Sequence, residues 1–107
     1  MTEPHTNYEI KQRVTVAEAP NLRVRELALA DGQCVPWHYH TNITDTFFCM
    51  EGPMLVCTRN PDQQHVLQAG GKLAVGPGTP HRVTGLNDSA CRFMIVQGIG
   101  IYDYVPA

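Results

Sequence analysis

Three histidines and one aspartate have the residue types and the spacing of a metal site. His38 and His40 are two residues apart, Asp45 follows five residues later, and His81 lies about forty residues further along the chain. Side chains two apart on a strand share a face, so the first two imidazoles should point the same way. Imidazole binds Fe, Zn, Mn or Ni, and a carboxylate compensates the charge of the ion. The pattern, brought together on paired strands, predicts one divalent transition metal per chain.

The residues around these four resemble the two motifs of the cupin superfamily. The stretch Gly32-x5-His38-x-His40-x4-Asp45-x6-Gly52 is similar to G-x5-H-x-H-x3,4-E-x6-G. The stretch Gly70-x5-Gly76-x-Gly78-x2-His81-x3-Gly85 is similar to G-x5-P-x-G-x2-H-x3-N. The resemblance implies a jelly-roll barrel, or double-stranded β-helix, of about six to eight strands. It also implies a metal at one mouth, with His38, His40, His81 and Asp45 as the ligands.

Three positions depart from the motifs. Asp45 replaces a Glu, Gly76 replaces a Pro and Gly85 replaces an Asn. The two glycines should affect only the loops, but Asp45 is one methylene shorter than Glu, which leaves two roles open. Asp45 either ligates the metal, or lies beside a three-histidine site and acts as the catalytic group that holds a bound water. From the sequence alone we favour the second role.

The implied chemistry depends on the metal. With Fe(II), similar small cupins suggest dioxygenase-type cleavage of an enolisable substrate. With Zn, Mn or Ni, Lewis-acid chemistry is more natural, such as isomerase- or lyase-type reactions of a sugar acid. We therefore expect a metal-dependent enzyme that acts on a small organic molecule. The alternative is a non-catalytic cupin module that binds a metal or a small ligand.

Several other side chains are of types that occur in or around such sites. Phe47 and Cys49 share the face of Asp45 by strand alternation and are expected to line the pocket as packing residues. The remaining histidines, His5 and His65, stand in no such pattern and are expected to be ordinary residues. Arg82 and Arg92 are expected to be exposed rather than to bind an anionic substrate.

Short strands must position these residues. Alternating apolar and polar stretches are broken by turns every 8–12 residues or so, and helical periodicity is scarce. This predicts an all-β barrel in one domain, 11–107, after a loose segment, 1–10. The expected strands are 22–29 with a slip in phase near Glu26, then 35–40, 44–50, 54–59, 65–68, 72–75, 81–84, 91–97 and an edge strand over 99–105.

Composition narrows the classes of partner. The 107 residues carry a net charge of −2, which gives no electrostatic footprint for nucleic acid or an anionic membrane. No apolar run approaches the roughly 20 residues of a membrane span, and 1–10 does not read as a secretory signal. We expect a cytoplasmic protein whose cysteines, Cys34, Cys49, Cys57 and Cys91, are reduced thiols without a close-spaced metal pattern.

The opposite faces of the ligand-bearing strands are also apolar. Trp37, Tyr39, Phe48 and Met50 should point away from the ligands. An apolar outer face needs a cover, which either the N-terminal segment or a second copy of the chain would supply. We favour a homodimer, because aromatic residues and Met are enriched at interfaces.

Overall fold

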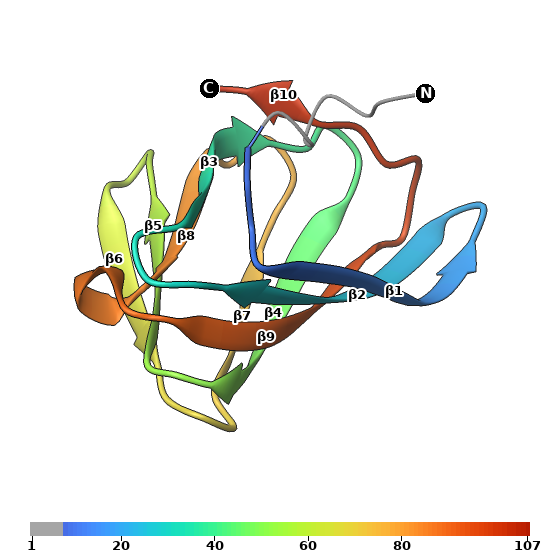
Figure 1. The fold of residues 1–107 in the computed structure, drawn as a ribbon. Coiled ribbons are helices and arrows are strands. Elements are labelled where there is room, and N and C mark those ends of the chain that lie inside the picture. Colours follow the sequence, from blue (N-terminus) through green and yellow to red (C-terminus); the bar gives the residue numbers. More distant parts are fainter. Residues whose placement is uncertain (1–7) are drawn as a thin grey trace.

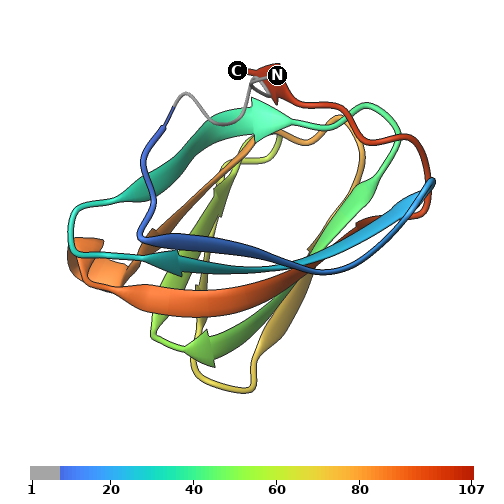
Figure 2. The same ribbon diagram turned by 45° about the vertical axis from the view of Figure 1, so that its right-hand side comes forward.

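The computed structural model describes residues 8–107 and confirms an all-β jelly roll of two antiparallel sheets (Figure 1). One sheet has the order β1-β2-β9-β4-β7 and the other the order β10-β3-β8-β5-β6. Figure 2 shows β3 and β10 lying opposite β1, β2 and β9. The strands are β1 (Gln12–Ala19), β2 (Leu22–Leu29), β3 (Cys34–Tyr39), β4 (Thr44–Glu51), β5 (Met54–Thr58), β6 (Gln63–Leu67), β7 (Lys72–Val75), β8 (His81–Gly85), β9 (Cys91–Gly98) and β10 (Val105–Pro106). A 3-10 turn, η2 (Leu86–Asp88), precedes β9. Within residues 8–107, no helix is long and apolar enough to cross a membrane.

The core forms where the inward faces of the two sheets meet. Phe47 of β4 and Phe93 of β9 are almost fully buried, with ring centroids 5.7 Å apart. Tyr8 and Ile10 pack against this core, so residues before Lys11 contribute to it. The rest of the segment expected to be loose, 1–7, lies outside the described residues, as does His5.

The slip in phase predicted near Glu26 is wrong. β2 pairs with β9 in continuous register from Leu22 opposite Gly98 to Leu29 opposite Cys91. The irregularity lies instead in β1, between Thr15 and Ala17. The sequence looked out of phase because a charged residue, Arg25, occupies an inward position on β2 and is buried there.

The edge strand predicted over 99–105 is also wrong for most of its length. Only Val105 and Pro106 pair with β3, and residues 99–104, which we call the C-terminal strap, form no regular ladder. The strap leaves β9 and passes close to the loop after β3, where a Cβ on Gly100 would lie 2.6 Å from the carbonyl oxygen of Asn42. Glycine allows this approach and the positive φ of 151° at position 100.

The expected apolar outer face is divided between two sheets. β3 and β4 are consecutive in sequence but belong to different sheets. Trp37 and Tyr39 therefore lie on the outside of one sheet, whereas Phe48 and Met50 lie on the outside of the other. One partner surface cannot cover all four. The guanidinium of Arg59 already lies over the Trp37 ring, 3.8 Å from its centroid.

Candidate metal centre

The four side chains that the sequence singled out come from both sheets. His38 points inward from β3, His40 follows the end of that strand, and His81 begins β8, directly opposite His38 in the ladder. Asp45 is on β4, in the other sheet. The expectation that all four share one face of paired strands is therefore wrong. The carboxylate instead faces the histidines across the interior of the barrel.

The loop before His81 is tied to the end of β3. Gly78 has a φ of 75°, a left-handed conformation that favours glycine. Its N–H donates to the carbonyl oxygen of His40 over 2.8 Å. This bond holds the loop, and with it His81, against the His38–His40 segment.

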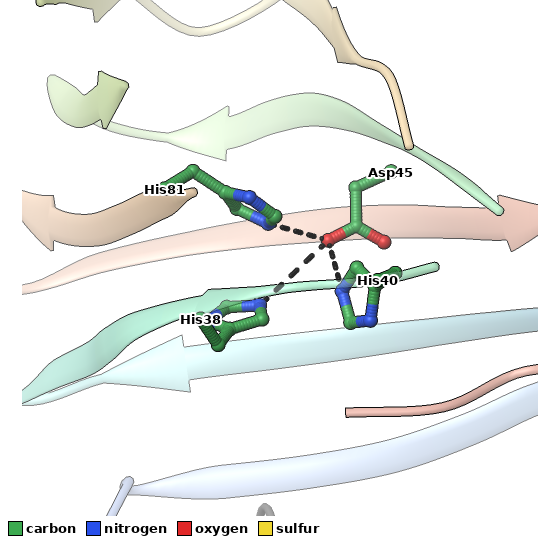
Figure 3. Close-up of side chains that lie close together, drawn as sticks. All are labelled: His38, His40, Asp45 and His81. Carbon is green, nitrogen blue, oxygen red and sulfur yellow. Dashed lines mark hydrogen bonds and ion pairs between the residues drawn. The ribbon is translucent and has the colours of Figure 1, made fainter. Parts of the chain in front are cut away.

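The side chains converge on a single point (Figure 3). Asp45 Oδ2 lies 2.8 Å from Nε2 of His40, 2.8 Å from Nε2 of His81 and 4.0 Å from Nε2 of His38. One ligand atom from each residue lies within 4.8 Å of the others. The exposed fractions are only 4% for His38, 2% for His40, 1% for Asp45 and 1% for His81.

These distances fit a transition-metal ion. Ligand atoms about 2.1 Å from one ion are about 3 Å apart at right angles and about 4 Å apart on opposite sides. The shortest observed separations, 2.8 Å, and the longer one of 4.0 Å lie close to these two values. The ligand atoms as a whole span up to 4.8 Å, which exceeds the second value, so the side chains would close in around a bound ion; the donor types and their burial suit one.

Backbone carbonyls fix the orientation of all three rings. Nδ1 of His38 lies 2.7 Å from the Pro36 oxygen, that of His40 lies 2.6 Å from the Asp103 oxygen, and that of His81 lies 2.9 Å from the Thr79 oxygen. A carbonyl oxygen can only accept a hydrogen bond, so each Nδ1 must carry the hydrogen and donate it. Each ring is thereby held with its Nε2 toward the centre of the cluster. The same tautomer is required of histidines that ligate a metal through Nε2.

The rings of His40 and His81 each meet an oxygen acceptor at both nitrogens. A neutral imidazole carries a single N–H, so contact of Nε2 with Asp45 Oδ2 needs an added proton or a cation in its place. The cluster is therefore arranged for positive charge between the Nε2 atoms and the carboxylate. This is the chemistry of a metal-binding donor set.

The pKa values follow from the same contacts. Burial alone would raise the pKa of Asp45, but the hydrogen bonds from His40 and His81 and their charges lower it. Burial would lower the pKa of His40, but its hydrogen bond to Asp45 and the charge of Asp45 raise it. Burial, then the charge of His81, lowers the pKa of His38 to about 3. His38 is thus neutral at physiological pH, while His40 retains its proton to a higher pH than usual.

We expect metal binding at pH 6.5 to release a proton. The raised pKa of His40 means that the metal-free pair of His40 and Asp45 holds a proton above the ordinary histidine value of 6.5. Affinity should therefore fall about tenfold for each pH unit below that pKa. His38 should add nothing, because its pKa of about 3 leaves it neutral already. Calorimetry in two buffers of different ionisation enthalpy measures the release, and none at pH 6.5 would contradict the assignment.

The same proton affects the fold without metal. Because the pKa of His40 is raised in the folded state, the pair stabilises the metal-free barrel fully below about pH 6.5. That contribution is lost as the pH rises through the raised pKa.

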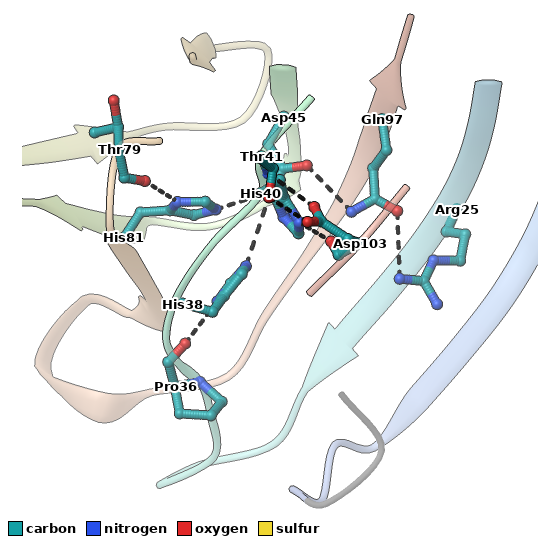
Figure 4. A network of polar contacts seen from close by, with 10 residues as sticks. All are labelled: Arg25, Pro36, His38, His40, Thr41, Asp45, Thr79, His81, Gln97 and Asp103. Carbon is teal, nitrogen blue, oxygen red and sulfur yellow. Dashed lines mark hydrogen bonds and ion pairs between the residues drawn. The ribbon is translucent and has the colours of Figure 1, made fainter. Parts of the chain in front are cut away.

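A polar chain behind Asp45 was missed by the sequence analysis. Gln97 Nε2 donates to Asp45 Oδ1 over 3.1 Å, and Arg25 Nη2 donates to Gln97 Oε1 over 3.3 Å (Figure 4). Gln97 could have been found, because it alternates with the inward-facing Phe93 and Ile95 and lies opposite Asp45 in the ladder. This chain turns the other carboxylate oxygen, Oδ2, toward the histidines.

The C-terminal strap covers the cluster from outside. The Tyr104 ring stacks on His38 with centroids 4.6 Å apart and an interplanar angle of 15°. The Tyr102 ring lies 5.3 Å from that of His40. Asp103 accepts hydrogen bonds from the backbone N–H and the hydroxyl of Thr41, which anchors the strap to the loop after β3. Sequence periodicity could not find these tyrosines, because the strap is irregular.

The inner cavity beside the cluster is small, about 20 Å³. Its lining includes Phe47, whose ring also meets His81 edge-on at 6.0 Å, but not Cys49. Cys49 is buried deeper in the core, and burial raises the pKa of its thiol. All four cysteines are free thiols. Arg92 lies on the outside of its sheet, where it pairs with Glu26 and Glu51.

Comparison with known proteins agrees with this architecture. The family model described as "Cupin domain" matches residues 25–97. A cupin-2 domain protein from Shewanella frigidimarina is 22% identical, with a TM-score of 0.69 over 84% of this chain and 82% of that one. A double-stranded β-helix protein from Klebsiella pneumoniae is 23% identical, with a TM-score of 0.77 over 90% of this chain and 83% of that one.

An oxalate oxidase also has this fold. It is 20% identical, with a TM-score of 0.74 over 89% of this chain, which spans 53% of that protein. At such identities the likeness of the solved structures establishes the fold alone. Among curated proteins, none matches the chain.

Proposed function

The chain belongs to the cupin family, and from this premise we propose that it is a metal-dependent enzyme acting on a small organic molecule. The observation that carries the proposal is the convergence of three Nε2 atoms and Asp45 Oδ2 in a buried cluster. One divalent transition ion, Fe, Zn, Mn or Ni, would be held there by His38, His40, His81 and Asp45. Such an ion supplies Lewis acidity or, if it is Fe, redox chemistry.

The geometry changes our preference for the role of Asp45. The carboxylate lies as close to His40 and His81 as neighbouring ligands of one ion do. Its strand brings it far enough inward to offset the missing methylene. We therefore assign Asp45 to the ligand set rather than to a position behind a bound water, with Gln97 as the residue that positions it.

For the class of reaction we take the oxalate oxidases of this fold as the starting point of the proposal. One of these oxidases is described in complex with glycolate, at 20% identity to this chain. This favours an oxidoreductase acting on a small oxygen-rich acid over an isomerase or lyase. The phenyl ring of Phe47 and the tyrosines of the strap would exclude bulk water from the reacting groups.

The second candidate is a non-catalytic binding module. It is favoured by the size of the inner cavity, since about 20 Å³ holds roughly one water. Structural metal sites are closed, whereas catalytic sites keep an open position. Both candidates would bind metal. Only an enzyme, whose substrate would displace part of the strap, would also show turnover.

One experiment separates the two candidates. The purified protein is analysed for bound metal, loaded with Fe(II), Mn, Zn or Ni, and assayed for oxygen uptake and product with small hydroxy acids, diketones and phenols. An enzyme should turn over at least one class with one metal, and a Gln97→Met variant should slow that turnover. Stoichiometric metal without turnover of any substrate class would favour the binding module.

We also propose a homodimer formed through the outside of the β1-β2-β9-β4-β7 sheet. Side chains on this face form two cross-strand rows, Val24–Val96–Thr46 and Glu26–Met94–Phe48. Phe48 is 37% exposed although it is a large apolar residue, and Met50 follows it on the same face. A second copy is a suitable cover for the apolar part of this face, which also holds the ion pair of Glu26 and Arg92, because such a patch can meet itself across a two-fold axis.

A Phe48→Glu substitution is expected to give a monomer. The added charge would lie between Met94 and Lys72 on this face, and removing it from water against a second copy costs free energy even with Lys72 beside it. Light scattering at micromolar concentration measures the mass. The control is Val66→Glu, which places the same charge on an exposed residue of the other sheet and should leave the dimer intact. A monomeric wild-type protein would refute the proposal.

A further inference from the structure

The C-terminal strap forms part of the wall of the inner cavity. Tyr102 and Tyr104 line this cavity together with His38 and Asp45. The cavity measures about 20 Å³, and the four proposed ligands are between 1% and 4% exposed. A space of this size holds roughly one water, whereas a transition ion with the waters that it carries needs more room. An ion can therefore reach the ligands only when part of the wall moves.

The strap is the part of this wall that is least tied to the sheets. The other lining residues, apart from Tyr8, belong to strands, whereas the strap forms no ladder. Its outward side chains, Ile99 and Ile101, are 75% and 67% exposed and so bury little apolar surface. Segments of this kind have the lowest local stability in a fold. Opening of the strap is therefore less costly than separation of two strands.

Both ends of the strap are fixed. The N–H of Gly100 donates to the Asn21 oxygen over 2.9 Å, and Val105 and Pro106 pair with β3. The strap can thus bend away between these points without release of the rest of the barrel.

Asp103 fastens the middle of the strap to the loop after β3 (Figure 4). Its carboxylate accepts a hydrogen bond from the N–H of Thr41 over 2.7 Å and another from the Thr41 hydroxyl. We call this pair the latch. Both bonds lie at the exposed surface, so water can replace them when the latch opens, and their net contribution is modest.

The same residue orients one of the proposed ligands. Nδ1 of His40 donates to the carbonyl oxygen of Asp103 over 2.6 Å, across 63 residues of sequence. The rings of His38 and His81 instead donate to carbonyl oxygens that lie only two residues before them. Those two rings would keep their orientation if the strap moved. His40 would lose the acceptor that directs its Nε2 toward the cluster.

We propose that the strap is the gate of the metal centre, with Asp103 as its latch residue and as the residue that positions His40. The inference rests on the proposed function, because the gate serves the proposed metal site. Opening of the latch would uncover the cavity and loosen one ligand together. Conversely, an ion held by His40 would keep Nδ1–H turned toward the strap and favour the closed state, because such coupling is reciprocal.

The first test is the rate at which Zn²⁺ enters and leaves the protein. Asp103→Ala removes the carboxylate but keeps the carbonyl group that orients His40. We expect both uptake and release, followed with a chromophoric chelator by stopped flow, to become about tenfold faster, since two exposed hydrogen bonds are lost. The Kd should change by less than about threefold, because the closed strap predominates with and without the ion. Asp103→Asn, which keeps one acceptor oxygen, and Thr41→Val, which keeps the backbone donor, should have smaller effects in the same direction.

The matched control is Asp31→Ala. Asp31 also accepts a hydrogen bond at an exposed position, from the backbone N–H of Ala90 over 2.9 Å, but at the end of the barrel near η2. Its loss should affect stability and leave both zinc rates unchanged. If Asp103 only stabilised the fold, Asp103→Ala would lower Tm without faster uptake. That result, or equal acceleration in Asp31→Ala, would overturn the gate.

The second test follows the strap itself. Chymotrypsin cleaves after tyrosine, so cleavage after Tyr102 or Tyr104, identified by mass spectrometry, reports how often the strap is open. In metal-free protein, Asp103→Ala should be cleaved there about tenfold faster than wild type, and Asp31→Ala at the wild-type rate. Saturating Zn²⁺ should slow this cleavage in wild type. Cleavage that zinc does not slow would overturn the coupling between the strap and His40.

These outcomes are separable from failure of the proposed function. A protein that binds no zinc would refute the metal site, yet cleavage of the metal-free Asp103→Ala and Asp31→Ala variants would still test the latch. A zinc-binding protein whose uptake and release were unchanged in Asp103→Ala would refute only the gate.

Discussion

The double substitution His38→Ala, His81→Ala is expected to abolish metal binding. The two rings lie side by side in the β3–β8 ladder, and their Nε2 atoms would supply two of the four proposed ligands. The two ligands that remain, His40 and Asp45, offer too few donors to hold a transition ion tightly. Metal content measured by elemental analysis should fall from one ion per chain to background, with circular dichroism to establish that the barrel is folded.

The same loss should appear in thermal stability. An ion present at about a thousand times its Kd stabilises the folded state by about 4 kcal/mol, because it binds the native form alone. For a domain of about 100 residues this raises Tm by roughly 15 °C or more. Treatment with a chelator should lower the Tm of wild-type protein by that amount and leave the double variant unchanged. His65→Ala, on β6 and outside the cluster, is the control. Full occupancy in the double variant would refute the assigned site.

The second large effect is expected at Asp45. Asp45→Asn removes the negative charge from the centre of the cluster while leaving the shape nearly unchanged. Loss of a residue that is hydrogen-bonded to a ligand typically weakens metal affinity by roughly 10- to 100-fold. Loss of the Asp45 carboxylate should weaken it more, because we assign Asp45 to the ligand set. We therefore expect more than a 100-fold loss in Asp45→Asn. A metal competition assay with a chromophoric chelator measures the change.

Two further variants make the result specific. Gln97→Met removes the hydrogen bond to Asp45 Oδ1 but leaves the charge, so it should cost about 10- to 100-fold. Asp45→Glu restores the ligand type of the cupin motif and should retain metal, although the added methylene must fit beside a cavity of only about 20 Å³. If Asp45→Asn kept full metal affinity but lost turnover, Asp45 would be the group that holds a water, as the sequence first suggested.

The strands could be predicted where alternation and turn residues agree. Residues 72–75 form a strand with the predicted bounds, because glycines precede it and a rigid Gly/Pro loop follows it. The inward positions of Asp45, Phe47 and Cys49 also follow from strand parity alone. The local pattern suffices here because a side chain on a strand can point to only one of two faces of the sheet.

Other features depend on contacts that are distant in sequence. Which sheet contains β4 is decided by its pairing with β7 and β9, so the sequence could not tell that Asp45 faces the histidines across the barrel. Arg25 contradicts the rule that charges lie outside, because Gln97, 72 residues away, receives its hydrogen bond. The tyrosines of the strap were missed because an irregular segment has no periodicity to detect.

The origin of the ligands in two sheets has a mechanical consequence. Three histidines belong to the β10-β3-β8-β5-β6 sheet or the loop that leaves it, and Asp45 belongs to the other sheet. A bound ion would thus tie the two layers together at one end, much as a disulfide would, while the opposite end has packing and loop hydrogen bonds such as that from the Gly32 N–H to the Asp88 oxygen. Separation of the layers should then begin at the end near η2, where amide hydrogens exchange soonest, and the ion should slow exchange most along residues 38–45. In such a barrel a bound metal would determine the order in which the structure opens, as well as the chemistry at its mouth.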